Sequence, residues 1–234
     1  MLLYIVRHGD PIYNPDTLTP KGHLQAKALS KRFLAGGLDK IYSSPMIRAQ
    51  QTAEPTAEVL GMPIEILDWT SELAAAKDFF VEERKSDGKR GWVFGINPTY
   101  YMNNESAKYY DNWYEAPFFK DYPEKDFKKG FERVQNASDE LLAKHGYERN
   151  GSVYNIINPN NDKIAVFCHA GFGSIWLSHL LGIPPHMAWP NIYMPCTSVA
   201  TFEFVNHENG LTLPSLRQMA DLSHLYIEGL QNNI

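Results

Sequence analysis

The sequence predicts an α/β fold, a three-layer α/β/α sandwich with a mostly parallel central sheet. Two short and largely apolar runs indicate this fold, one over 2–6 and one over 163–168, of which the second opens on Lys163. Strands that are buried on both faces of a parallel sheet show such runs instead of a polar alternation. Each run is followed by a turn and then by a helical pattern, so strand, turn and helix alternate along the chain.

The expected elements follow in chain order. A strand over 2–6 ends at Arg7-His8-Gly9, and a helix opens near Pro20, because proline suits the first helical position and Thr19 suits the N-cap. Gly36-Gly37 ends this helix. The remaining expected elements are a strand over 39–42, a helix over 46–60, strands over 63–67 and 163–168, a helix over 174–181, and a strand over 197–205 with a hairpin return over 211–213.

The middle of the chain departs from this alternation. From about residue 77 to residue 129, aromatic side chains are mixed with charged ones and no clean period is visible. This number of aromatic residues is untypical of a disordered linker. We therefore expect one domain over 1–234, within which 77–129 is an ordered, partly helical insertion that forms a cap over one end of the sheet.

Composition and charge exclude several classes of function. The 234 residues carry a formal net charge of −5, which argues against nucleic acid as a partner, because proteins that bind it have a basic surplus. No apolar run approaches membrane-spanning length, so no membrane partner is expected. Two cysteines, Cys168 and Cys196, make no disulfide framework, and no signal segment is visible. The sequence predicts a cytoplasmic protein.

Basic side chains stand where three expected strands lead into the next segment. They are Arg7-His8, Arg48 and His169. The carboxyl ends of parallel strands meet at one edge of a sheet, so these side chains can converge. Two arginine forks can bind the oxygens of a phosphoryl group, and an imidazole can accept that group covalently. With the backbone N–H groups of a turn over 171–173, they predict a phosphoryl site in which cationic side chains replace a metal.

Four sequence blocks extend this pattern in chain order. They are Arg7-His8-Gly9 with Asn14, Leu18–Gly22 with Gln25-Ala26, Ser43–Pro45 with Arg48-Ala49 and Gln51–Ala53, and Cys168–Gly171. Together they resemble the histidine phosphatase superfamily, the phosphoglycerate-mutase-like group. The resemblance covers about 1–72 and 160–226. It implies an enzyme without a cofactor that acts on a small phosphorylated metabolite.

The resemblance also implies a role for each matching residue. His8 becomes the nucleophile that forms phosphohistidine, and His169 belongs to the same catalytic centre. The proton donor to the leaving group is a carboxylate after the third strand, where Glu72 is the best match. The side chains that hold the phosphoryl group are Arg7, Asn14, Arg48 and His169.

Some positions depart from the family pattern or lie outside it. Asp10-Pro11 stands where members carry Glu followed by Thr or Ser, so Asp10 rivals Glu72 as the proton donor. In the insertion, Arg84 and Arg90 are either part of a solvated charge run or cap residues that reach a second anionic group on the substrate. The spacing of the remaining histidines matches no set of zinc ligands, and no metal site is expected.

Three functions are compatible with these residues. The leading hypothesis is a phosphatase that hydrolyses a small phosphate monoester through a phosphohistidine intermediate. The alternatives are a phosphoglycerate mutase, which uses the same first half-reaction, and a non-catalytic module that binds a phosphorylated ligand. The Leu18–Gly22 block favours the phosphatase branch. An aromatic surface left exposed by the insertion would favour a homodimer.

Overall fold

The computed structural model describes residues 1–85, 87–95, 97–102 and 106–230. A six-stranded sheet lies at its centre, and β1, β10, β4 and β5 are parallel neighbours within it. β11 runs antiparallel to both of its neighbours, β1 and β13. In spatial order the strands are β13 (Pro214–Asp221), β11 (Val199–Phe204), β1 (Leu2–Arg7), β10 (Lys163–Cys168), β4 (Lys40–Ser43) and β5 (Ile64–Ile66).

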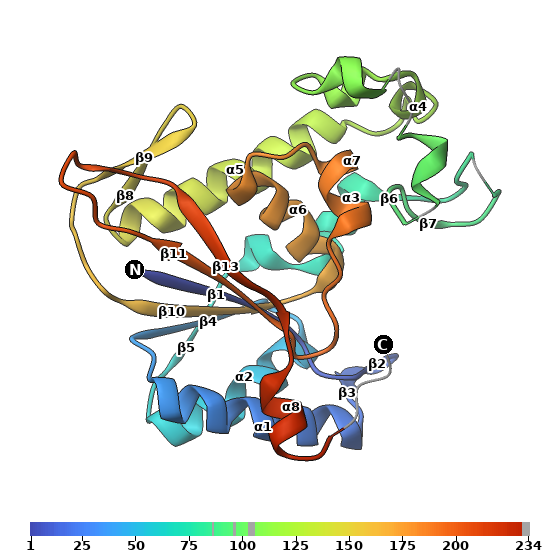
Figure 1. Ribbon diagram of the computed structural model, residues 1–234. Helices are drawn as coiled ribbons and strands as arrows, with labels where there is room; N and C mark the ends of the chain where they lie inside the picture. The colour runs from blue at the N-terminus through green and yellow to red at the C-terminus, as the bar shows by residue number, and fades with distance from the viewer. Residues whose placement is uncertain (86, 96, 103–105, 231–234) are drawn as a thin grey trace.

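Helices cover both faces of this sheet (Figure 1). On one face lie α1 (Pro20–Gly36), α2 (Ile47–Leu60) and the short α8 (Ser223–Ile227). On the other face lie α3 (Glu72–Phe79), α5 (Phe127–Lys144) and α6 (Ala170–Leu181). The predicted α/β/α sandwich with a mostly parallel sheet is confirmed.

The apolar run of β1 explains why both faces of the sheet are covered. Successive side chains of a strand point to opposite faces. Leu3 and Ile5 belong to the cluster beneath α5 and α6, whereas Val6 belongs to the cluster beneath α1 and α2. β10 divides its side chains in the same way, since Val166 lies in the first cluster and Phe167 in the second.

The ends of α1 and α2 form as the sequence predicts. The hydroxyl of Thr19 accepts a hydrogen bond of 3.0 Å from the backbone N–H of Gly22 and caps α1. Gly61 closes α2 in the left-handed conformation, at φ 65°.

Two local expectations were wrong. The segment after His169 is not a turn, because α6 begins at Ala170 and not at residue 174. Its first N–H groups find an acceptor outside the helix, as described below. The segment that directly follows β11 does not pair with β11 to form a hairpin. Instead β12 (Leu211–Thr212) pairs with β9 (Val153–Ile156), which also pairs with β8 (Tyr147–Asn150), and β13 makes the return.

The segment over 80–126, here called the cap, connects α3 to α5. Its rings pack on one another, as in the contacts of Trp113 with Phe94 (5.8 Å between centroids) and with Phe119 (5.1 Å). This cluster continues into the core beneath α6. We propose that the cap is the insertion expected over 77–129. Its elements are β6 (Phe80–Val81), β7 (Gly91–Trp92), α4 (Pro117–Lys120) and 3-10 helices over Pro98–Tyr100, Ser106–Tyr109 and Trp113–Glu115.

The other short elements flank the sheet edge. They are the hairpin of β2 (Pro11–Tyr13) and β3 (Asp16–Leu18), α7 (Pro185–Ala188), and 3-10 helices over Asp68–Thr70 and Trp189–Asn191. None of the helices in the described part of the chain combines the length and apolar composition needed to cross a bilayer.

His186 on α7 makes the fold sensitive to acid. Its imidazole is fully buried against the rings of Trp113 and Phe119, and neither ring nitrogen has a partner among the described residues. Burial lowers the pKa of His186 from 6.5 to about 4. Between these values the unfolded chain binds a proton that the folded chain does not, so stability falls as the pH decreases through this range.

We therefore expect His186→Phe to stabilise the protein more at pH 5 than at pH 7. At pH 5 the neutral buried imidazole costs about 2 kcal/mol, a cost that phenylalanine does not incur. Thermal unfolding midpoints of both proteins at both pH values measure this difference. An equal change at the two pH values would contradict the assignment.

Candidate active site

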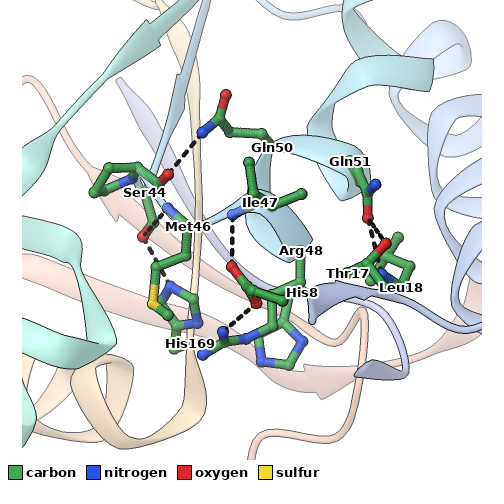
Figure 2. Close-up of polar contacts among 12 residues, drawn as sticks. His8, Thr17, Leu18, Ser44, Met46, Ile47, Arg48, Gln50, Gln51 and His169 are labelled. Atoms are coloured by element: carbon green, nitrogen blue, oxygen red, sulfur yellow. Dashed lines mark hydrogen bonds and ion pairs between the residues drawn. The ribbon is translucent and has the colours of Figure 1, made fainter. Parts of the chain in front are cut away.

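The carboxyl ends of β1, β10 and β4 lie side by side and bring together the residues that follow them. The backbone N–H of His8 donates to the carbonyl oxygen of Cys168 at 2.9 Å, and that of Ser44 donates to Phe167 at 2.8 Å. The imidazoles of His8 and His169 are consequently neighbours, with 5.2 Å between their centroids. Figure 2 shows His8, Arg48 and His169 together beside the start of α2.

His8 is 3% exposed and is held in one tautomer. Its Nδ1 donates to the carbonyl oxygen of Gly9 at 2.7 Å, so Nε2 carries the free lone pair. The backbone N–H of Gly9 in turn donates to the hydroxyl of Thr52 at 2.9 Å, which fixes the turn on α2. Burial lowers the pKa of His8 to about 3, and the charges of Arg7 and Arg48 act in the same direction. The ring is therefore neutral near pH 7 and suited to act as a nucleophile.

The two arginines reach the same place from different elements. Arg7 ends β1 and donates from Nη1 to the carbonyl oxygen of Met194 at 2.6 Å. Arg48 lies in the first turn of α2, is 4% exposed, and donates from Nη1 to Asp16 at 2.5 Å. The Nε of each arginine is buried without a hydrogen-bond partner among the described residues. Such donors are costly when they stay unpaired, so both are available to an anion.

His169 stands behind His8. It is fully buried, and its Nε2 lies 2.8 Å from the hydroxyl of Ser44. Burial holds the pKa of His169 well below its usual value, with further lowering by His8 and the two arginines. The imidazole is therefore neutral and does not add a third positive charge to the site.

Glu72 enters the site from α3, of which it is the first residue. Its carboxylate accepts from the N–H of Gly171 (3.2 Å) and from that of Phe172 (3.0 Å) in the first turn of α6. These are the amides that the sequence suggested for phosphate. Withdrawal from water raises the pKa of Glu72, although the two hydrogen bonds and the nearby arginines partly oppose this shift. A raised pKa suits a carboxyl group that donates a proton.

Gly171 allows this approach because it has no side chain. A Cβ atom on Gly171 would lie 2.6 Å from Oε1 of Glu72 and 2.8 Å from the indole of Trp92. The proton-donor candidate and the cap residue Trp92 therefore both lie against this one backbone position.

These side chains line one cavity of about 590 Å³, within the usual range for small-molecule sites. Its wall contains two arginines, one histidine and one glutamate, namely Arg7, Arg48, His8 and Glu72. Most of the remaining wall is apolar or aromatic. It consists of Tyr13, Met46, Leu73, Ala76, Phe80, Trp92, Ala170, Gly171, Ser174, Trp189, Ile192, Tyr193 and Met194. Among the residues that the structure describes, no three His, Cys, Asp or Glu side chains gather as a metal-binding group.

Two predicted residues do not come to this cavity. Asn14 is exposed in the turn between β2 and β3 and is not part of the lining. Asp10, the rival proton donor, lies outside the lining because its carboxylate accepts from the hydroxyl of Thr19 at 2.7 Å. Of the two carboxylates considered, Glu72 is the one that faces the cavity.

The two cap arginines also lie outside the lining. Arg84 donates to the carbonyl oxygen of Gly95 at 2.7 Å and pairs with Asp87, so it holds the loop of the cap together. Arg90 is largely exposed and lies 5.4 Å from the centroid of the Phe80 ring. The structure therefore does not support the expectation that they reach over the pocket.

The β2–β3 hairpin contributes residues that the sequence did not reveal. Asp16 accepts from Arg48 and also from the backbone N–H of Ile47 at 2.8 Å. The ring of Tyr13 lies 5.4 Å from the guanidinium carbon of Arg48. Gln51 secures the hairpin on α2, because its Oε1 accepts from Thr17 and from Leu18 (Figure 2). A three-residue strand gives no periodic signal, so only the structure could show this arrangement.

Comparison with known proteins gives a consistent result. Residues 3–77 match the model of the histidine phosphatase superfamily (branch 1), a segment that contains Arg7, His8, Arg48 and Glu72. Over this segment the chain is similar to the histidine phosphatase superfamily. The predicted resemblance is confirmed.

Individual proteins resemble this chain to different extents. A Hydrogenobacter thermophilus protein named "Putative phosphoserine phosphatase 2" is 28% identical over 153 residues, which cover 61% of this chain and 68% of that protein. Phosphoserine phosphatase from Entamoeba histolytica, solved with 3-phosphoglyceric acid, has a TM-score of 0.61 at 19% identity, over 96% and 98% of the two chains. A mycobacterial glucosyl-3-phosphoglycerate phosphatase has a TM-score of 0.59 at 18% identity, over 93% and 97%. These two structures share the fold.

Proposed function

We propose that this protein is a metal-independent phosphatase that hydrolyses a small phosphate monoester through a phosphohistidine on His8. The observation that carries the proposal is the neutral imidazole of His8, whose Nε2 is free and which lines the same cavity as two arginines and Glu72. This arrangement supports the proposal, because an imidazole, two guanidinium groups and a carboxyl group surround one space.

The substrate phosphate binds as an anion beside Arg7, His8 and Arg48. The unpaired Nε–H groups of Arg7 and Arg48 donate to its non-bridging oxygens and offset its charge. Because phosphoryl transfer depends mainly on positioning and on charge neutralisation, two fixed guanidinium groups can supply what a metal ion supplies elsewhere.

In the first chemical step, Nε2 of His8 attacks the phosphorus atom in line with the leaving oxygen. The N–P bond forms as the P–O bond breaks, and Glu72 transfers its proton to the departing oxygen. The carbonyl oxygen of Gly9 remains bonded to Nδ1–H and stabilises the positive charge that develops on the ring.

In the second step, a water molecule attacks the phosphorus atom of phosphohistidine. Glu72, now ionised, accepts a proton from that water, and the N–P bond breaks to restore neutral His8 and release inorganic phosphate. The net reaction converts a phosphate monoester and water into an alcohol and phosphate.

The proposal is tested by hydrolysis of 4-nitrophenyl phosphate with and without a chelator, together with mass spectrometry of protein quenched in alkali during turnover. We expect chelator-insensitive release of phosphate and a phosphoryl group on the peptide that contains His8. Rapid interconversion of 2- and 3-phosphoglycerate with a bisphosphate primer would instead favour the mutase hypothesis.

Asp16 is expected to act by positioning Arg48. Asp16→Ala leaves a buried guanidinium without its acceptor, so we expect kcat/KM to fall by about tenfold, mainly through a higher KM. Asp16→Asn retains an acceptor oxygen and should keep most of the affinity. Steady-state kinetics and inhibition by vanadate measure both effects. Wild-type KM and vanadate inhibition in Asp16→Ala would contradict this role.

A further inference from the structure

The cavity has two chemically distinct parts. One part holds Arg7, His8, Arg48 and Glu72, close to the carboxyl edge of the sheet. The rest of its wall is dominated by rings and aliphatic side chains from the hairpin, the cap and the segment after α7. The rings are Tyr13, Phe80, Trp92, Trp189 and Tyr193.

The indole rings make this wall continuous. Trp92 on β7 contacts Phe80 on β6 (5.8 Å between centroids) and Trp189 (5.6 Å). Both tryptophans and Phe80 are partly exposed, although they line the cavity. Their ring surfaces are therefore available to a ligand, unlike the rings that form the buried core of the cap.

The cationic groups of the cavity are sufficient for one phosphate only. Among the described residues of its wall, the lysine and arginine side chains are Arg7 and Arg48, and both belong to the phosphoryl end. Arg84 is bound within the cap, and Arg90 lies outside the lining. The residues of the cap segment outside the described ranges are Ser86, Ile96, Asn103, Asn104 and Glu105, and their types add no positive charge.

We infer that the substrate is the monophosphate of an uncharged alcohol or phenol that carries a planar ring, and not a phosphate ester that carries a carboxylate. This inference rests on the proposed function and specifies its leaving group. The ring packs on the wall formed by Trp92 and Trp189, where aromatic contacts add to the burial of apolar surface. A carboxylate at the same place would lose water without gaining a cationic partner.

The inference sets this protein apart from the structural neighbours named for phosphoserine and for glucosyl-3-phosphoglycerate. Both of those compounds carry a carboxylate in addition to the phosphate. The shared fold therefore does not predict the leaving group, which is contacted by the cap and the hairpin.

The experiment compares two matched pairs of esters by kcat/KM. Phenyl phosphate is compared with 4-carboxyphenyl phosphate, and benzyl phosphate with 4-carboxybenzyl phosphate. The carboxylate makes 4-carboxyphenol the more acidic leaving group, so chemistry alone does not favour phenyl phosphate. We expect the uncharged ring ester to be preferred by at least about tenfold in each pair, as is typical when a charged group meets no partner.

A charge-introducing variant tests the cause of this preference. Leu73 lines the cavity and is 65% exposed, so Leu73→Arg adds a cation to the wall without disturbing the core. We expect it to raise kcat/KM for 4-carboxyphenyl phosphate by at least about fivefold relative to phenyl phosphate. Leu73→Gln, of similar polarity but without charge, is the matched control and should not change the ratio.

The possible outcomes separate the inference from the proposed function. If the carboxylated esters are hydrolysed as well as or better than their uncharged partners, the inference is wrong, while hydrolysis that depends on His8 still supports a phosphatase. If no ester gives turnover that depends on His8, the proposed function fails and the inference fails with it.

Discussion

His8→Ala is expected to lower the hydrolysis of phosphate monoesters by at least about a thousandfold, the largest effect of any single substitution in this chain. Alanine removes the atom proposed to accept the phosphoryl group, and the neighbouring imidazole of His169 does not line the cavity. Initial rates with 4-nitrophenyl phosphate measure the loss, and mass spectrometry should find no phosphorylated peptide.

The matched control for this change is His23→Ala, on the exposed face of α1. It should retain full activity. Because the imidazole of His8 is neutral and buried, its removal should leave the thermal midpoint within a few degrees of the wild-type value, which separates loss of chemistry from loss of fold. A folded His8→Ala protein with wild-type turnover would eliminate the proposed mechanism.

Glu72→Gln is expected to slow the hydrolysis of an alkyl phosphate such as benzyl phosphate by about a hundredfold or more. Glutamine cannot transfer a proton to the departing alkoxide. The loss should be much smaller for 4-nitrophenyl phosphate, because nitrophenolate leaves without a proton. Comparing kcat for the two esters therefore distinguishes a proton donor from a residue that only shapes the cavity, which would affect both equally.

Asp10→Asn is the matched control, and we expect it to lower activity by less than a few-fold, because an amide oxygen can still accept from Thr19. The pH dependence gives a second test. The pKa of Glu72 is raised by burial, and the proposed first step requires its protonated form. The rate with benzyl phosphate should therefore fall as the pH increases through that raised pKa, and this decrease should be absent from Glu72→Gln.

The parts of the site that could be predicted from the sequence are those fixed by strand ends. His8 and His169 follow apolar strands directly, and Arg48 lies in the first turn of the helix that follows β4. Parallel pairing of β1, β10 and β4 leaves little freedom in where these residues lie. Glu72 was identified from family resemblance alone, because a 3-10 turn separates it from β5. The start of α6 was predicted too late, because the glycines after His169 favour a turn. The sequence does not show that Glu72 accepts hydrogen bonds from N–H groups of this segment.

The residues that were missed depend on long-range contacts. Asn14 matches the family spacing, yet it lies in an exposed turn, whereas Asp16 two residues later holds Arg48. Hydrogen bonds from a short hairpin to α2 decide this difference, and they leave no periodic pattern in the sequence. The structure of the cap also depends on long-range contacts. Rings from its irregular segments pack on one another instead of on a regular helix or strand.

The contact at Gly171 links the cap to the acid–base chemistry. The indole of Trp92 and the carboxylate of Glu72 lie against the same backbone position, so we expect the cap to limit the access of bulk water to the proposed proton donor. Exchange of the cap for that of a relative would therefore alter more than the choice of leaving group. If the new cap placed no ring there, water would reach Glu72, its pKa would fall, and the optimum of the chimera would move to lower pH.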